Sequence, residues 1–219
     1  QNPNLQNIPI RSELGKKIRN AFVAEKGYKL VALDYSQIEL RIAAFLSKDK
    51  KLIEIFKNGE DIHNAVAAEV FGVTEDKVTS NMRRHAKIIN FGILYGMGIN
   101  ALRTNLDTDR ETAQNFYNSY INKFSGLAEY LDKMKEEAKK KGYTETYFKR
   151  RRYFPNLKSK LPFLRAQAER MAINAPVQGT SADIIKLAMI EVDKYLKKNN
   201  LKAHLLLQVH DELVYEIEE

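Results

Sequence analysis

The 219-residue sequence contains no cysteine, and it contains only four histidines. Without cysteine the chain can form no disulfide, thiolate metal site or thiol nucleophile, although this absence leaves its compartment open. Four histidines also disfavour a zinc site built from histidine alone. Long apolar runs are missing too, because stretches such as Leu205, Leu206 and Leu207 are far shorter than the roughly 18 residues of a membrane span. The first residues do not resemble a signal peptide, so nothing indicates a membrane role.

Positive charge is abundant. The chain has 36 Lys and Arg against 28 Asp and Glu, a formal charge of +8, and 44% of its residues are hydrophobic. That hydrophobic share suffices for one sizeable core or for two small lobes sharing a cleft. The basic excess favours a polyanionic partner such as nucleic acid, but ordinary solubility charge explains it equally well, so motifs must decide. The chain begins without Met and stops directly after a strand-like run, which leads us to expect a piece of a longer protein.

The hydrophobic pattern predicts strands near both ends of the chain and helices between them. Tyr28–Asp34 is typical of a buried strand, and a helix is expected over residues 36–46. Further helical patterns cover residues 50–57, 61–71, 80–96 and 108–141, the last with a break near Ser125-Gly126. A basic hairpin or loop is expected over residues 143–154, and two helices on either side of Pro176. Residues 204–217 predict two antiparallel strands with Asp211 at or near the bend. The pattern indicates an α+β fold, a small antiparallel sheet with an inserted helical lobe.

Two acidic motifs follow or separate predicted strands. Asp34 leaves the end of a hydrophobic strand, where a carboxylate is held rigidly and makes a good metal ligand, although an isolated Asp here more often supports a turn. Glu39 fits a helix capping box with Ser36, so accepting a backbone N–H could be its whole role. The adjacent Asp211 and Glu212 project negative charge from a rigid bend, which a divalent cation could compensate, but such pairs are also common in turns.

A third motif occupies the helix predicted over residues 80–96. Its residues Arg83, Lys87, Phe91 and Tyr95 recur every four positions and therefore share one face. Two cations and two aromatic rings suit a ligand that carries both phosphate charge and a stackable ring, as a nucleotide does. The alternative is an amphipathic helix with a solvated basic face, and the residues alone leave the two readings open.

Taken together, the three motifs resemble those of the family A DNA polymerases in order, wording and spacing. They are Asp-Tyr-Ser-Gln-Ile-Glu-Leu-Arg at 34–41, Arg-Arg-x-x-Lys-x-x-Asn-Phe-Gly-x-x-Tyr-Gly at 83–96 and Val-His-Asp-Glu at 209–212. Shorter matches agree: Asn4-Leu5-Gln6-Asn7-Ile8-Pro9, Asp61-Ile62-His63, Arg151-Arg152-Tyr153 and Pro176-Val177-Gln178-Gly179-Thr180. The resemblance covers essentially the whole chain. It departs at Lys149, where relatives often carry Gly.

The resemblance implies a small antiparallel palm sheet with an inserted helical fingers subdomain. Residues 1–47 and 142–219 would form the palm and residues 48–141 the fingers, while a thumb and the last palm elements are expected to be missing. The implied activity is Mg²⁺-dependent addition of dNTPs to a primer 3′-hydroxyl with release of pyrophosphate, as used in DNA replication and repair. Two Mg²⁺ ions, for which Mn²⁺ could substitute, would be held by Asp34, Asp211 and the Tyr35 carbonyl, with Glu212 as a supporting catalytic carboxylate.

The resemblance also assigns binding roles to individual residues. Incoming dNTP would be bound by Arg83 and Lys87 on the triphosphate, helped by His63 and Gln37, with Phe91 against the sugar and base, Tyr95 at the templating position and Glu39 as the steric gate against ribose. Primer-template DNA would be contacted by Arg11, Arg84, Arg170, Asn174, Gln178 and His210.

Two alternative functions stay open at this point. A non-catalytic nucleic-acid-binding fragment is one, because without a thumb the fragment's own activity is uncertain. A single-subunit RNA polymerase is the other, although Glu39 and the Asp211-Glu212 pair argue against it. A bacterial origin would imply a cytoplasmic, nucleoid location, and an organellar or viral origin also stays open. Protein partners are unknown.

Overall fold

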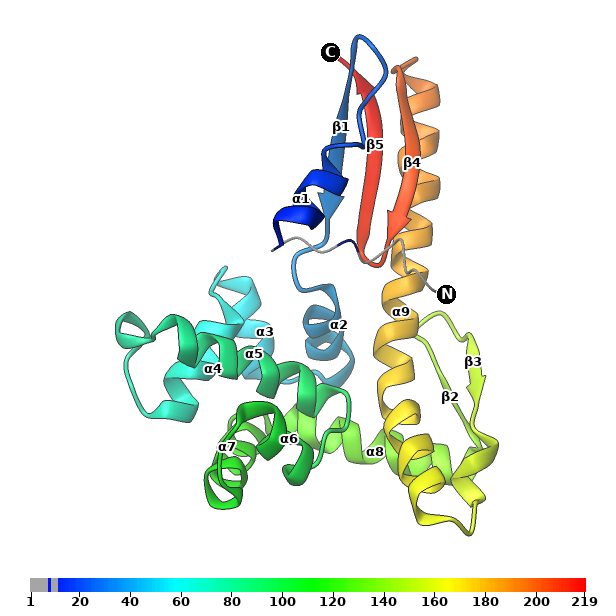
Figure 1. Ribbon diagram of the computed structural model, residues 1–219. Helices are drawn as coiled ribbons and strands as arrows, with labels where there is room; N and C mark the ends of the chain where they lie inside the picture. Colours follow the sequence, from blue (N-terminus) through cyan, green and yellow to red (C-terminus); the bar gives the residue numbers. More distant parts are fainter. Residues whose placement is uncertain (1–7, 9–11) are drawn as a thin grey trace. The chain divides into compact units, whose positions relative to one another are not determined.

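The computed structural model describes residue 8 and residues 12–219, so Arg11, one of the predicted DNA contacts, lies outside the described residues. The chain divides into two compact units (Figure 1). The sheet unit comprises Gln1–Ser36 and Ala182–Glu219, and the helical unit comprises Gln37–Ser181. Residues 37–47 and 142–181, which the sequence assigns to the palm, thus group with the helical unit by their contacts.

The sheet unit is built on three antiparallel strands. They are β1 (Tyr28–Asp34), β4 (Ala203–Val209) and β5 (Glu212–Glu218), with β5 in the centre (Figure 1). β4 and β5 form a hairpin, and β1 pairs with β5 in a register from Tyr28 opposite Glu218 to Asp34 opposite Glu212. This register brings the end of β1 to the hairpin turn. Helix α1 (Glu13–Arg19) precedes β1 and is capped by the Ser12 side chain.

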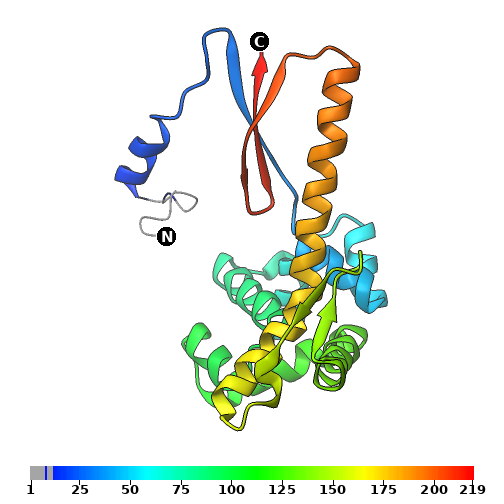
Figure 2. The same cartoon turned by 90° about the vertical axis from the view of Figure 1, so that its right-hand side faces the viewer.

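The strand predicted at Tyr28–Asp34 is confirmed, but its predicted burial is wrong. Leu30 is 38% exposed and Leu33 51% exposed. Among the described strands β1 is an outer one that pairs with β5 alone, and its side chains are covered much less than those of the central strand, where Leu213 and Tyr215 are buried. Figure 2 shows the last turns of α9 (Pro162–Lys198) running alongside this sheet. Partial burial raises the pKa of Tyr215, and the charge of Asp193 on that helix raises it further.

The helical unit holds seven further helices and a small hairpin. The helices are α2 (Ile38–Ser47), α3 (Lys50–Lys57), α4 (Ile62–Phe71), α5 (Ser80–Leu94), α6 (Ile99–Leu106), α7 (Arg110–Lys123) and α8 (Ser125–Lys141), with short 3₁₀ segments η1 (Glu75–Lys77) and η2 (Pro155–Lys158). Four of them begin at a side chain that accepts a backbone N–H bond: Asp49, Asp61, Thr79 and Asp109. The core is formed by large side chains that are fully buried: Leu40, Leu52, Ile62, Ile89, Leu94, Leu102, Tyr120, Phe124 and Leu127. Helices α1 and α6 were not predicted from the sequence.

The basic hairpin predicted over residues 143–154 is confirmed. Strand β2 (Tyr143–Glu145) pairs with β3 (Arg151–Tyr153), and Thr146 and Lys149 close the turn through backbone hydrogen bonds. Lys149 has a φ of 68°, in the left-handed region that favours glycine. The departure noted in the sequence therefore places a lysine in a backbone conformation that a glycine adopts without strain.

The prediction of two helices on either side of Pro176 is wrong. One helix, α9, runs from Pro162 to Lys198 with Pro176 inside it. Proline removes one helical hydrogen bond, but Ala172 and Val177 beside it are fully buried, and this packing offsets the missing bond. Among the described residues, no helix combines the length and apolar character that crossing a membrane requires.

Candidate functional site

The sheet unit brings the two acidic motifs together at one end of the sheet. Asp34 is the last residue of β1 and lies opposite Glu212, the first residue of β5. Asp211 occupies the turn before β5, and its carbonyl accepts a hydrogen bond from the Tyr35 backbone N–H at 3.4 Å. The turn is tight because His210 adopts a φ of 55°. The backbone thus brings the positions of Asp34, Asp211 and Glu212 to one end of the sheet, where β1 ends and the hairpin turns.

The charges at this end of the sheet interact. Burial raises the pKa of Asp34 above its ordinary value, and the negative charge of Asp211 raises it further. Two like charges this close are relieved by a cation bound between them. No group of three or more His, Asp or Glu side chains that could hold a metal occurs in the described part of the chain. The predicted ligand set is smaller, two carboxylates and a carbonyl, and Mg²⁺ is commonly bound by one or two carboxylates with substrate phosphates supplying other ligands.

Within the helical unit, Glu39 lies in the first turn of α2. The helix begins one residue later than a Ser36 cap requires, because its N-cap is Gln37, with a φ of 55° and no side-chain capping bond. The Glu39 carboxylate accepts a hydrogen bond from the Tyr95 hydroxyl at the end of α5. This bond joins the predicted gate residue directly to the predicted template-side tyrosine, which the sequence did not indicate.

Helix α5 presents the predicted stripe of cations and aromatic rings. Arg83 and Lys87 are exposed and Phe91 and Tyr95 are partly exposed, with the two ring centroids 6.0 Å apart. The opposite side of the helix carries Ile89 and Ile93 into the core. The four stripe residues therefore share one accessible face, as their spacing predicted.

Arg83 is held by the residue that caps the neighbouring helix. Its Nη2 and Nε donate to Asp61 Oδ2 at 2.6 and 3.0 Å. Asp61 Oδ1 accepts the backbone N–H groups of His63 and Asn64 at 2.8 and 3.2 Å and so caps α4. Partial burial pushes the pKa of Asp61 up, but the bonds from Arg83 and from these N–H groups outweigh it, and the net pKa lies below its ordinary value. Asp61 is anionic at neutral pH.

His63 lies beneath the stripe, 3% exposed, and contacts both Asn90 and Phe91. Its Nδ1 is 3.0 Å from Asn90 Nδ2, and its ring centroid is 5.8 Å from that of Phe91. Burial lowers the pKa of His63 to about 4; the Asp61 charge opposes this, while Arg83 and Lys87 add to it. The imidazole is therefore neutral at pH 7. With Asn90 Nδ2 as the donor, Nδ1 is the acceptor and Nε2 carries the proton.

Asp61 and Asn90 lie within the sequence motifs, but the sequence predicted no role for either residue. Asp61 is the first residue of the helix predicted over residues 61–71, and an Asp at the start of a helix is typical of an N-cap, so the sequence held a signal for its capping role. Its bond to Arg83 joins residues 22 positions apart in sequence and had none.

The predicted DNA-binding residues are spread over both units, and each is described within its own. In the helical unit Arg170 packs against Gly96, whose added Cβ would lie 3.2 Å from Arg170 Cγ. Gln178 is exposed, and the buried Asn174 Oδ1 has no hydrogen-bond partner among the residues that the structure describes. Arg84 donates to Asn81 on the surface of α5. In the sheet unit His210 is exposed at the hairpin turn.

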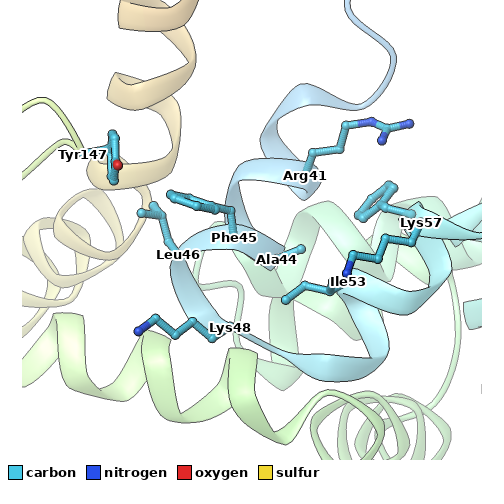
Figure 3. Close-up of a pocket in the computed structure, with 9 residues that line it drawn as sticks. Arg41, Ala44, Phe45, Leu46, Lys48, Ile53, Lys57 and Tyr147 are labelled. Atoms are coloured by element: carbon cyan, nitrogen blue, oxygen red, sulfur yellow. The ribbon is translucent and has the colours of Figure 1, made fainter.

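A separate cavity of about 570 Å³ lies in the helical unit (Figure 3). It is lined from α2, α3 and the β2–β3 turn by Arg41, Ala44, Phe45, Leu46, Lys48, Ile53, Phe56, Lys57 and Tyr147. Phe45 and Tyr147 meet edge to face at 5.2 Å. None of the predicted site residues lines this cavity, so the predicted nucleotide site is the open face of α5 and not this hollow.

Comparison with known proteins shows the family to which this chain belongs. The chain belongs to DNA polymerase family A, whose sequence profile matches residues 1–219. DNA polymerase I of Bacillus subtilis is 54% identical over 98% of the chain, and DNA polymerase I of Pseudomonas aeruginosa is 50% identical over 99%. The thermostable DNA polymerase I of Thermus aquaticus is 51% identical over 98%. The chain spans about a quarter of the length of these relatives, 24%, 24% and 26% respectively.

A solved structure is also similar. It is the POL domain of Pol1 from M. smegmatis in complex with a DNA primer-template and dNTP, with a TM-score of 0.94 and 49% sequence identity. The match covers 99% of this chain and 38% of that one. The α+β fold class predicted from the sequence is thus confirmed.

Proposed function

We propose that this chain forms the palm and fingers of a template-directed DNA polymerase that adds dNTPs to a primer 3′-hydroxyl and releases pyrophosphate. The observation that carries the proposal is the meeting of Asp34 with Asp211 and Glu212 at one end of the sheet, in a chain of DNA polymerase family A. In this proposal residues 1–47 and 142–219 serve as palm and residues 48–141 as fingers. Its substrates would be dNTP and primer-template DNA, the molecules named in the related M. smegmatis complex.

The carboxylate end of the sheet suits divalent cations. Asp34 and Asp211 would hold two Mg²⁺ ions with the Tyr35 carbonyl, since these hard oxygen donors are the ligands Mg²⁺ prefers and their mutual repulsion favours a cation. Bound there, Mg²⁺ supplies Lewis acidity, which lowers the pKa of the attacking hydroxyl and stabilises charge on the pyrophosphate. Glu212 lies opposite Asp34 and adds negative charge beside these ligands. Mn²⁺ offers similar chemistry.

The open face of α5 suits the incoming nucleotide. Arg83 and Lys87 would bind the triphosphate, and neutral His63 would donate Nε2–H to a phosphate oxygen. The partly exposed Phe91 ring offers an apolar surface to the sugar and base, with Tyr95 next to it at 6.0 Å. Gln37, at the N-cap of α2, is the remaining residue predicted to help bind the triphosphate.

The Tyr95–Glu39 hydrogen bond supports a sugar-selecting role for Glu39. A carboxylate fixed by a hydroxyl donor cannot swing aside at low cost, so it would exclude a ribose 2′-hydroxyl from the volume it occupies. This gate favours dNTP over rNTP and therefore a DNA polymerase over an RNA polymerase.

Primer-template DNA would be contacted by residues that read the shape of the duplex. Arg84, Arg170, Gln178 and His210 offer donors to phosphates and to the minor-groove acceptors that all base pairs share. Asn174, whose buried Oδ1 has no hydrogen-bond partner in the described part of the chain, lies four residues after Arg170 on α9 and is the remaining residue proposed to contact DNA. The net charge of +8 suits this polyanionic partner.

The test is single-nucleotide primer extension by the protein expressed from its complete gene, with Mg²⁺ and each template base in turn. We expect only the complementary dNTP to be added, and Asp34→Ala or Asp211→Ala to abolish addition. Asp193→Ala, an exposed Asp on α9 outside the site, is the matched control and should retain activity. Extension that survives either site substitution would contradict the proposal.

A further inference from the structure

The two carboxylate oxygens of Asp61 serve two different elements. Oδ1 accepts the N–H groups that open α4, and Oδ2 accepts two bonds from the Arg83 side chain on α5. The same cap fixes the start of the helical turn that carries His63, because His63 N–H is one of the capped groups. One side chain therefore fixes both Arg83 and the backbone of His63.

The bonds to Asp61 use only one edge of the Arg83 guanidinium. Nε and Nη2 point at Oδ2, and no other acceptor is bonded to Arg83 within the described residues. A guanidinium has five N–H donors in a rigid plane, so fixing the Nε–Nη2 edge also fixes the direction of the Nη1 donors. Arg83 remains 47% exposed, which leaves that second edge accessible to a ligand.

The negative charge of Asp61 indicates that this residue orients Arg83 and does not attract the ligand. A carboxylate beside a triphosphate site repels the ligand, so Asp61 cannot serve to attract it. It neutralises part of the charge that Arg83 and Lys87 would otherwise offer. A residue that weakens attraction but restricts a long, flexible side chain improves binding only by reducing the entropy lost when that side chain is ordered.

We propose that Asp61 is a positioning residue, which clamps one edge of Arg83 so that the other edge faces the triphosphate of an incoming nucleotide. This inference rests on the proposed nucleotide site on α5 and assigns a role to a residue outside the metal-binding carboxylates. It acts through Arg83 and does not itself touch the nucleotide.

The variant that isolates this role is Asp61→Ser. Serine is as good an N-cap as aspartate, so α4 keeps its capping bond, but the short hydroxyl cannot hold Arg83. Asp61→Asn does not separate the two roles, because the single oxygen of an amide could accept a bond either from the helix N–H groups or from the guanidinium. Asp109→Ser is the matched control, since Asp109 caps α7 by accepting Thr112 N–H at 2.8 Å and pairs with none of the arginines that the structure describes.

The experiment measures the dissociation constant of a dNTP by isothermal titration calorimetry, with the protein expressed from its complete gene. We expect Asp61→Ser to weaken binding about fivefold, the effect of freeing one long side chain. Asp109→Ser should change it by less than about twofold. In an Arg83→Ala background, Asp61→Ser should cause no further loss, because its effect passes through the arginine.

Three results would overturn the inference: unchanged affinity in Asp61→Ser, an equal loss in the Arg83→Ala background, or no dNTP binding by the unsubstituted protein. Melting temperatures of all variants, measured in parallel, separate lost affinity from lost structure. Failure of the proposed function is distinguishable, since it would appear as absent primer extension while dNTP affinity still depended on Asp61.

Discussion

Asp49 offers a sharp test of how the helical unit is held together. It is 4% exposed, and its two oxygens accept backbone N–H groups from two different helices. Oδ1 accepts from Leu52 at the start of α3 at 3.0 Å, and Oδ2 accepts from Leu127 at the start of α8 at 3.1 Å. Both leucines are fully buried, so water cannot replace either bond.

Replacing Asp49 with Ala removes both acceptors. Loss of the α3 cap costs about 1 kcal/mol, and leaving a buried N–H of Leu127 unpaired costs about 1–3 kcal/mol more. We therefore expect the helical unit to lose about 3 kcal/mol of stability. This loss corresponds to a roughly hundredfold larger equilibrium constant for local opening. Hydrogen–deuterium exchange of peptides from α3 and α8 measures this directly.

The exposed cap Asp109 provides the comparison, because Asp109→Ala removes a cap without stranding a buried N–H in a second helix. Exchange in Asp49→Ala that is no faster than in Asp109→Ala would refute the reasoning.

Gly126→Ala is a second probe of the contact between Asp49 and α8. Alanine normally stabilises a helix relative to glycine, yet a Cβ at position 126 would lie 3.0 Å from Asp49 Cα, so here we expect destabilisation. A more stable Gly126→Ala variant would show that Asp49 and α8 do not meet this closely.

Three further predictions concern other parts of the helical unit. His63 stays neutral to a pKa of about 4 when folded but takes up a proton near 6.5 when unfolded, so stability should fall as pH drops from 6.5 to 4, by at most about 3 kcal/mol. Urea midpoints across this range should be flatter for His63→Gln, and an equal slope would contradict the shift. Lys149→Gly should stabilise the hairpin by up to about 1 kcal/mol because φ is positive there, and a lower melting temperature would argue against this conformation. Tyr95→Phe should raise rNTP incorporation several-fold by removing one hydrogen bond that holds Glu39, and Glu39→Ala should raise it further; unchanged dNTP to rNTP selectivity in both would disprove the gate.

Local patterns predicted much of the fold. The strand Tyr28–Asp34 and the helix Lys50–Lys57 have the bounds that their apolar periodicity predicted. The break near Ser125 is also confirmed, since α7 ends at Lys123 and α8 begins at Ser125. Periodicity fails where tertiary packing decides. Proline normally ends a helix, yet Pro176 lies within α9 because buried neighbours support the helix on both sides.

The sequence predicted which residues belong to the candidate site, but it predicted few of the contacts between them. The pairing of β1 with β5 places Asp34 opposite Glu212, which only the motif resemblance had suggested, because no local pattern joins residues so far apart. The Tyr95–Glu39 and Asp61–Arg83 bonds were not predicted, since each depends on how two helices pack. The stripe on α5 was predicted because one helical period determines it.

We propose that Asp34 and Asp211 hold the metal ions of a template-directed DNA polymerase. A crystal structure of the protein from its complete gene, grown with Mn²⁺, dNTP and primer-template DNA, tests this assignment, with anomalous scattering used to locate the manganese. We predict anomalous peaks at coordination distance, about 2.1 Å, from carboxylate oxygens of both Asp34 and Asp211. Manganese bound elsewhere, or a dNTP bound with no metal at these two residues, would show that Asp34 and Asp211 are not the metal ligands.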